Sequence, residues 1–210
     1  MNLSCKVTDL GHRYQHNYLF RNLNFEATAG KLLVIKGNNG AGKSTLLKIM
    51  SGAMEPVEGS VQYLEGEMPQ NPDNLWKKIG LVAPYQELPE ELSLLELIDF
   101  QIKMIPMADP KPSYAQRSAL FGMEGEASRP LGEYSTGMKQ KAKLILSLTK
   151  GRNIWLLDEP TSNLDPASHQ LFWDWIAEHK QNRLIVVATN DSAEMGQADD
   201  LLDLNASGSH

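Results

Sequence analysis

Apolar runs of strand length alternate with helical patterns along most of the chain. The runs at 31–36, 153–157 and 183–189 are almost continuously apolar, which is typical of strands buried on both faces of a sheet. Weaker strand patterns occur at 3–10, 22–27, 60–64 and 79–83, and helical patterns at 43–50, 136–149 and from Asp165 onward. Strands that alternate with helices predict an α/β fold with a parallel sheet covered on both faces.

The two ends of this pattern differ from its middle. The opening strands alternate around a polar turn near Gln15, which predicts an N-terminal antiparallel β subdomain. Residues 89–130 combine an amphipathic helical pattern with a stretch, 106–129, that contains Pro, Ser and Gly. We therefore expect a single domain over 1–205 with a helical sub-lobe of about 88–150 inserted in its core, followed by a tail at 206–210.

The composition of the 210-residue chain is that of an ordinary globular protein, with 41% hydrophobic and 22% charged residues. Acidic residues outnumber basic ones by 26 to 20, which argues against a nucleic-acid partner. No apolar stretch reaches the roughly 18 residues of a membrane-spanning helix, and because no apolar segment follows a basic start, we expect no secretory signal. We expect a cytoplasmic protein that would need another protein to hold it at a membrane.

The first chemical motif follows the strand at 31–36. Residues 37–44 read Gly-Asn-Asn-Gly-Ala-Gly-Lys-Ser and match the phosphate-loop pattern G-x-x-x-x-G-K-[ST], between a predicted strand and a predicted helix. Glycines let the backbone wrap around phosphate oxygens, and the helix N-terminus adds positive potential. Lys43 should reach the β- and γ-phosphates, and the Ser44 hydroxyl should bind Mg²⁺. The predicted nucleotide-binding residues here are Gly37, Asn38, Asn39, Gly40, Ala41, Gly42, Lys43, Ser44 and Thr45.

Two carboxylates end the buried strand at 153–157. Ligands bind outside the carboxyl ends of parallel strands, so Asp158 should emerge beside the phosphate loop and help to hold Mg²⁺. Glu159 would then face the γ-phosphate and orient an attacking water, which makes it the predicted catalytic carboxylate. The two motifs together predict binding of a nucleotide and attack of a water on its γ-phosphate.

A third motif completes the pattern. Residues 134–141, Tyr-Ser-Thr-Gly-Met-Lys-Gln-Lys, resemble the signature of ABC-type ATPases, and the Ser-x-Gly-Met-Lys-Gln form is similar to nucleotide-binding subunits of exporters. Gln86 resembles the Q-loop glutamine, residues 162–165 resemble the D-loop, and Tyr14 resembles the aromatic residue that stacks on adenine. The resemblance extends from Leu3 to about Leu204.

This resemblance implies partners that the chain lacks. In the family, two nucleotide-binding domains pair head to tail as a homodimer or heterodimer, so Ser135 and Gly137 would bind the ATP held by the other copy's phosphate loop. Gln86 would contact Mg²⁺ and link the nucleotide to a docking surface around 86–105. A separate integral membrane subunit would hold the chain at the inner face of the membrane and carry out translocation.

The sequence departs from the family at Asn190, where a histidine usually contacts the γ-phosphate. Asn190 is expected to contribute to catalysis but cannot become cationic, so we expect weaker or partner-dependent hydrolysis. His169 and His179 are expected to face solvent, Trp173 and Trp175 to pack in the interior, and Lys139, Lys141 and Lys143 to form a solvated helix face. Two alternatives remain open, namely a soluble ABC-type ATPase of an assembly pathway and a regulatory nucleotide-binding subunit with weak hydrolysis.

Overall fold

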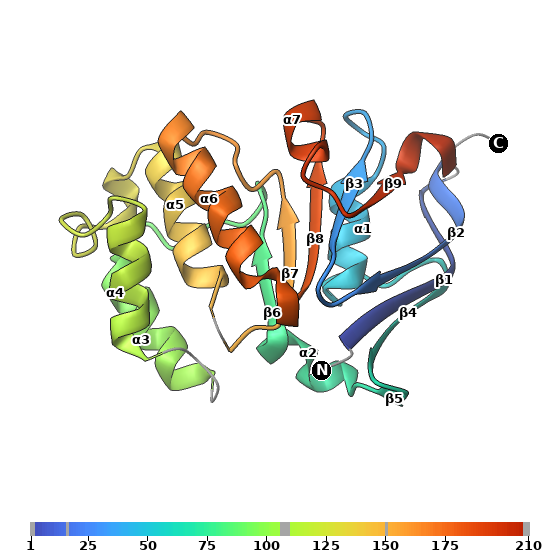
Figure 1. Cartoon of the computed structure of the whole chain (residues 1–210), viewed down its shortest axis with the longest axis horizontal. Coiled ribbons are helices and arrows are strands. Elements are labelled where there is room, and N and C mark those ends of the chain that lie inside the picture. Colours follow the sequence, from blue (N-terminus) through green and yellow to red (C-terminus); the bar gives the residue numbers. More distant parts are fainter. Residues whose placement is uncertain (1–2, 16, 106–109, 150, 208–210) are drawn as a thin grey trace.

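The computed structural model describes residues 3–15, 17–105, 110–149 and 151–207. A parallel sheet lies in the middle of the molecule, an antiparallel sheet lies on one side of it, and a group of helices lies on the other (Figure 1). This arrangement confirms the predicted α/β fold with an N-terminal antiparallel sheet, a parallel core sheet and a helical region.

The antiparallel sheet contains longer strands than the sequence pattern predicts. Its strands are β1 (Leu3–Tyr14), β2 (Asn17–Thr28), β4 (Glu58–Glu65) and β5 (Met68–Pro69), in the order β2-β1-β4-β5. The pairing of β1 shifts register after Val7, and Asp9 has a positive φ of 47°. A bulge of this kind breaks the alternation of buried and exposed positions, which is why the pattern predicted a strand end at Leu10.

The core sheet consists of β3 (Leu32–Lys36), β6 (Ile79–Val82), β7 (Ile154–Asp158), β8 (Leu184–Thr189) and β9 (Asp200–Asp203). Its order is β6-β7-β8-β3-β9, and every neighbouring pair is parallel. The hydrophobic pattern does not predict β9, because this edge strand has only four residues and begins and ends with Asp. The carboxyl ends of β3, β7 and β8 lie next to one another, and this edge of the sheet carries the predicted phosphate loop and both predicted carboxylates.

The helices occupy the segments between these strands. They are α1 (Lys43–Met50), α2 (Pro72–Lys78), α3 (Leu94–Met104), α4 (Lys111–Leu120), α5 (Thr136–Ser147), α6 (Pro166–His179) and α7 (Ser192–Met195), with 3-10 turns η1 (Leu131–Glu133), η2 (Lys180–Asn182) and η3 (Leu204–Ser207). Ser93 and Glu96 form a capping box at the start of α3, and Asp165 caps α6 before a proline at its first position.

Alternate residues of the parallel sheet pack into two separate cores. On one face, Trp155 and Val187 contribute to a core shared with the helical region; on the other face, Leu156 and Val186 contribute to a core shared with α1 and the antiparallel sheet. All four side chains are fully buried. A strand that is buried on both faces must be apolar at every position, which explains the continuous apolar runs in the sequence.

The segment between β6 and β7 contains α3, α4, η1 and α5, within the range expected for the inserted lobe. The division of 1–205 into a core and an inserted lobe stays a prediction. Of the expected tail, 208–210 lie outside the described residues, and the backbone of 206–207 belongs to η3. Among the described residues, no helix combines the length and hydropathy needed to cross a membrane.

Candidate nucleotide-binding site

The predicted phosphate loop connects the end of β3 to the first residue of α1. Gly40 and Gly42 adopt positive φ angles of 85° and 96°, a region that residues with a Cβ rarely adopt. A Cβ at Gly42 would also lie 3.1 Å from ring carbons of Phe20 on β2. The two glycines are therefore required for the turn itself and, at Gly42, for close packing against the antiparallel sheet.

Lys43 is the first residue of α1, and its side chain is 7% exposed. Its ammonium Nζ donates to the carbonyl oxygens of Gly37 at 2.7 Å and Asn38 at 3.4 Å. The cation is thus held inside the curve of the loop, where it can approach phosphate oxygens without a large rearrangement of its stem.

Asp158 is the last residue of β7, and Glu159 follows it directly. The Asp158 side chain is 1% exposed, and neither of its oxygens accepts a hydrogen bond from the described residues. Burial raises the pKa of the Asp158 carboxyl, while the nearby Ser44 hydroxyl and the Lys43 ammonium partly oppose that rise. A buried carboxylate without a protein donor, next to a serine hydroxyl, fits the oxygen ligands that Mg²⁺ prefers.

Glu159 follows in a strained backbone conformation. Its φ is 49°, and its amide donates to the carbonyl oxygen of Ala188 on β8 at 2.9 Å. Burial raises the pKa of its carboxyl, Lys43 opposes the rise, and the negative charges of Asp158 and nearby acids add to it. The left-handed turn directs the chain away from the sheet immediately after Asp158.

These groups meet in one hollow of about 360 Å³ at the carboxyl edge of the sheet. Its lining comprises Tyr14, Leu19, Asn38, Asn39, Gly40, Gly42, Lys43, Ser44, Thr45, Asp158 and Glu159. Tyr14 is 51% exposed, and its ring meets His12 edge to face with centroids 5.3 Å apart. A lining that combines an aromatic ring with a cation and two carboxylates suits the base, the phosphates and the magnesium ion of a nucleotide.

Six other predicted site residues lie outside this lining, and two of them, Gly37 and Ala41, belong to the phosphate loop itself. Asn190 follows β8, and its Nδ2 donates to Oδ1 of Asn39 in the phosphate loop at 3.1 Å. Gln86 lies in the wall of two neighbouring hollows, with a buried Oε1 that has no partner among the described residues. Ser135 and Gly137 are at the start of α5, in the helical region.

Ser135 is exposed rather than buried in the interior of the helical region. It caps α5, and its Oγ accepts a hydrogen bond from the amide of Met138 at 3.2 Å. Gly137 packs closely against the predicted D-loop, since a Cβ there would lie 2.7 Å from the carbonyl oxygen of Asn163. The start of this helix is thus exposed next to a tightly packed turn.

The expected solvated lysine face on α5 is wrong. All three lysines are half-buried, and each contacts an oxygen of another segment. The segments that they contact are distant from α5 in the sequence. Lys139 pairs with Glu90 at 2.6 Å, Lys141 pairs with Asp165 at 2.9 Å, and the Lys143 Nζ donates to the carbonyl oxygen of Ala83 at 3.0 Å.

Three residues near the site were not predicted. Leu19 lines the hollow, the Asn205 side chain accepts a hydrogen bond from the Asn38 amide at 3.0 Å, and Glu194 is 2% exposed and hydrogen-bonds the Thr161 hydroxyl. A hydrophobic residue in a strand, an asparagine near the C-terminal end and an acid on a four-residue helix carry no motif. Only the packing of the fold shows their positions.

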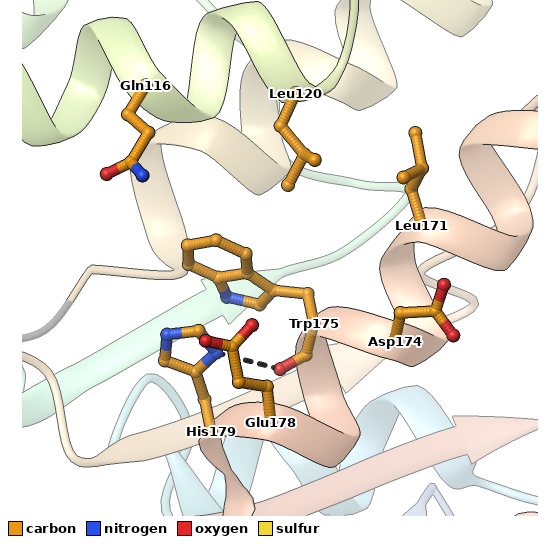
Figure 2. A pocket seen from close by; sticks show the side chains of 7 residues that line it. All are labelled: Gln116, Leu120, Leu171, Asp174, Trp175, Glu178 and His179. Atoms are coloured by element: carbon orange, nitrogen blue, oxygen red, sulfur yellow. Dashed lines mark hydrogen bonds between the residues drawn. The ribbon is translucent and has the colours of Figure 1, made fainter.

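A second hollow, of about 370 Å³, lies between α4 and α6 (Figure 2). The ring of His179 stacks on Trp175 with centroids 4.0 Å apart, and its Nδ1 contacts the Trp175 carbonyl oxygen at 3.0 Å (Figure 2). Both His169 and His179 are half-buried, whereas the sequence predicted that they face solvent. Trp173 packs in the core as expected. With Asp174 and Glu178 in its lining and neither Lys nor Arg among the lining residues, this hollow does not suit a triphosphate.

Comparison with known proteins gives one consistent result. A family model described as ABC transporter matches residues 20–162. The chain is 33% identical over 188 residues to the cytochrome c biogenesis ATP-binding export protein CcmA 2 of Cupriavidus metallidurans, covering 88% of each chain. It is 30% identical over 194 residues to CcmA of Rhizobium johnstonii, covering 90% of this chain and 87% of that relative.

Solved structures agree on the fold. A dimeric post-hydrolysis structure of the ATP-binding cassette MJ0796 bound to ADP and Pi superposes with a TM-score of 0.80 at 22% identity, covering 95% of this chain and 93% of that one. An ATP-binding subunit of an ABC transporter gives a TM-score of 0.83 at 24% identity, covering 95% and 85% of the two chains.

Proposed function

The chain belongs to the ABC transporter ATPase family and is an ATP-hydrolysing subunit of such a transporter, and from this premise we propose that two copies, or one copy and a related chain, sandwich ATP head to tail. Each ATP would lie between the phosphate loop of one copy and the start of α5 of the other. The solved cassettes that share this fold include dimers. One observation carries the proposal: the hollow around Lys43 lacks Ser135, which is exposed on another part of the same chain.

Within one copy, we assign the chemistry to five side chains of the hollow and to Gln86 beside it. Lys43 would bind the β- and γ-phosphates, and Glu159 would orient the attacking water and accept its proton. Asp158 and Ser44, with Gln86 from the neighbouring wall, would hold Mg²⁺. That ion would neutralise phosphate charge when bound. Tyr14 would stack on the base.

The second copy would complete the site with donors aimed at the γ-phosphate. The Ser135 Oγ accepts the hydrogen bond from the Met138 amide, so the hydroxyl would use its own hydrogen to donate to the γ-phosphate. The first amides of α5 add positive potential in the same direction. Since the γ-phosphate would touch both copies, its hydrolysis would remove contacts from the interface and release the dimer.

The membrane partner would bind a surface that we name the docking groove. This hollow, of about 410 Å³, adjoins α3 and is lined in part by residues of the segment 86–105. Its lining comprises Trp76, Gln86, Leu88, Pro89, Leu97, Phe100, Gln101, Met104, Ile105, Lys143, Leu146, Ser147 and Arg152. Phe100, Met104 and Trp76 are 58%, 53% and 50% exposed, which is unusual for such large apolar side chains in one patch. Relatives named as export proteins favour outward translocation.

A glutamine in place of Glu159 tests the sandwich directly. We expect Glu159→Gln to bind ATP with Mg²⁺, to lose turnover by at least about 100-fold and to form a stable dimer, because the water loses its base while the γ-phosphate still joins both copies. Light scattering with ATP, ADP or no nucleotide measures the mass. A variant that stays monomeric at high concentration with ATP, Mg²⁺ and the membrane partner present would contradict the proposal.

A regulatory subunit with weak hydrolysis is the second candidate, and Asn190 favours it. Its amide binds Asn39 of the phosphate loop but offers the γ-phosphate no cationic group. Absence of turnover by the wild-type chain in its complete transporter would support this candidate. Glu159 at the end of β7 argues against it, because a chain that only binds ATP needs no carboxylate there.

A further inference from the structure

The docking groove carries positive charge, whereas the whole chain has a negative net charge. Acidic residues exceed basic ones by 26 to 20 in the sequence, yet the lining of the groove contains two basic residues, Lys143 and Arg152, and neither Asp nor Glu. The remaining lining is mostly apolar, with exposed rings of Trp76 and Phe100. An apolar groove with two cations fits a different occupant from a purely apolar one.

Neither cation has a carboxylate partner among the described residues. The Lys143 Nζ donates to the carbonyl oxygen of Ala83 at 3.0 Å, and no ion pair within 4.0 Å joins Lys143 or Arg152 to a described acid. Burial lowers the pKa of both groups, so partial loss of water already disfavours their charged forms. An apolar segment lying over them would remove more water and add to this cost unless it brought a counter-charge.

We propose that the docking groove binds a short apolar segment of the membrane subunit that carries an Asp or Glu, and that this carboxylate pairs with Lys143 and Arg152. The inference rests on the proposed membrane partner and adds the chemistry by which that partner is recognised. Large apolar side chains of the segment would cover Trp76 and Phe100, while its carboxylate would reach Lys143 on α5 and Arg152 beyond the end of α5. A segment without an acid would leave both cations desolvated, which gives the groove its specificity.

The same pairing would act on the predicted Q-loop. The carbonyl oxygen of Ala83 accepts both the Lys143 Nζ and the amide of Gln86, at 3.0 and 3.1 Å. Lys143 and Gln86 also line both the docking groove and the hollow beside the start of α5. A carboxylate that draws Lys143 toward the groove would weaken one of the two bonds that hold this turn. Lys143 is therefore a positioning residue between the partner and Gln86.

Crosslinking in native membranes tests the occupant. A photoreactive phenylalanine analogue replaces Phe100 in the full chain, and mass spectrometry identifies the protein and segment attached to it. We expect an integral membrane subunit, attached through a cytosolic segment that contains Asp or Glu. A membrane subunit attached through a segment free of both acids overturns this inference alone. Attachment to a soluble protein or to a second copy overturns the membrane partner and this inference with it.

Charge reversal tests the pairing in the purified transporter. We expect Lys143→Glu to weaken association with the membrane subunit by at least about 30-fold, Lys143→Arg to retain it, and a Lys in place of the partner's acid to restore association with Lys143→Glu. Lys103→Glu makes the same charge change on an exposed residue of α3 outside the lining, and should remain within about twofold of wild type. Wild-type association by Lys143→Glu overturns the proposal. Crosslinking through Phe100 decides the question independently if that variant fails to fold.

Discussion

The phosphate loop and the start of α5 are built alike but placed differently. In both, a helix begins directly after a small residue, Gly42 or Ser135, and the N-terminus of a helix attracts an anion. The phosphate loop adds a 7% exposed lysine and faces two carboxylates in a shared hollow. Ser135 is exposed and lies outside that hollow. One copy therefore contains both parts of a site, but the two parts do not line the same hollow.

Substitutions in the two regions should separate ATP binding from ATP turnover, and this is the largest expected effect. Lys43→Ala removes the charged donor, so we expect the ATP affinity of the single chain to fall by about 100-fold. Ser135→Arg blocks a surface that only the opposite copy's ATP would meet, so affinity should stay within about threefold while turnover falls by about 100-fold. Nucleotide titration of dilute chain and phosphate release measure the two quantities.

Mixing these two variants provides the control. Each alone is expected to be inactive, but a mixed dimer contains one site with an intact Lys43 and an intact Ser135 from different copies. Random pairing of equal amounts should restore about a quarter of the wild-type sites, because half of the dimers are mixed and each has one intact site. A mixture as inactive as its parts would mean that both residues serve the same copy.

A smaller effect is expected where the start of α5 meets the predicted D-loop. Gly137→Ala would place a methyl group 2.7 Å from the Asn163 carbonyl oxygen, so the helix and the turn must separate. We expect about tenfold slower turnover and a loss of about 1–3 kcal/mol in the free energy of unfolding, with ATP binding by the phosphate loop unchanged. Steady-state kinetics and denaturant unfolding measure both.

Gly125→Ala is the matched control. It lies in the same helical region, a Cβ there would meet nothing within 4 Å, and its φ is not positive. Kinetics and stability of this variant should equal those of wild type. Equal behaviour of the two variants would show that the close contact between α5 and the turn is not required.

The phosphate loop and α5 also differ in how well the sequence predicts their contacts. The phosphate loop was predictable because its strand, glycines and Lys43 are contiguous, and because Gly42 answers a local backbone requirement. The partners of α5 were not, because Lys139 meets a residue 49 positions away and Lys143 meets one 60 positions away. Sequence spacing predicted a solvated face, whereas the fold lays two loops across that face.

The same reasoning applies to the rest of the fold. Continuous apolar runs predicted β3, β7 and β8, since burial on both faces leaves no polar position. The bulge near Asp9 and the buried position of Glu194 depend on neighbours from distant segments, and neither leaves a periodic signal. Features set by the local backbone could be predicted from the sequence. Contacts between segments that are distant in the sequence could not.

The smallest expected effect concerns Asn190. Substitutions there test whether the groups around the hollow are sufficient for hydrolysis without the usual histidine. Its Nδ2 already reaches the phosphate loop through Asn39, so the position is suitable for contact with the γ-phosphate. Asn190→His adds a group that can carry charge near neutral pH, and turnover should rise about threefold; Asn190→Ala removes the donor and should lower it by a similar factor. ATP affinity should change less than turnover.

Asn182→His on exposed η2 controls for an added histidine and should have no effect. Ordinary turnover by the purified wild-type chain, unchanged in Asn190→Ala, would show that other groups complete the hollow. It would also show that the missing histidine does not limit hydrolysis.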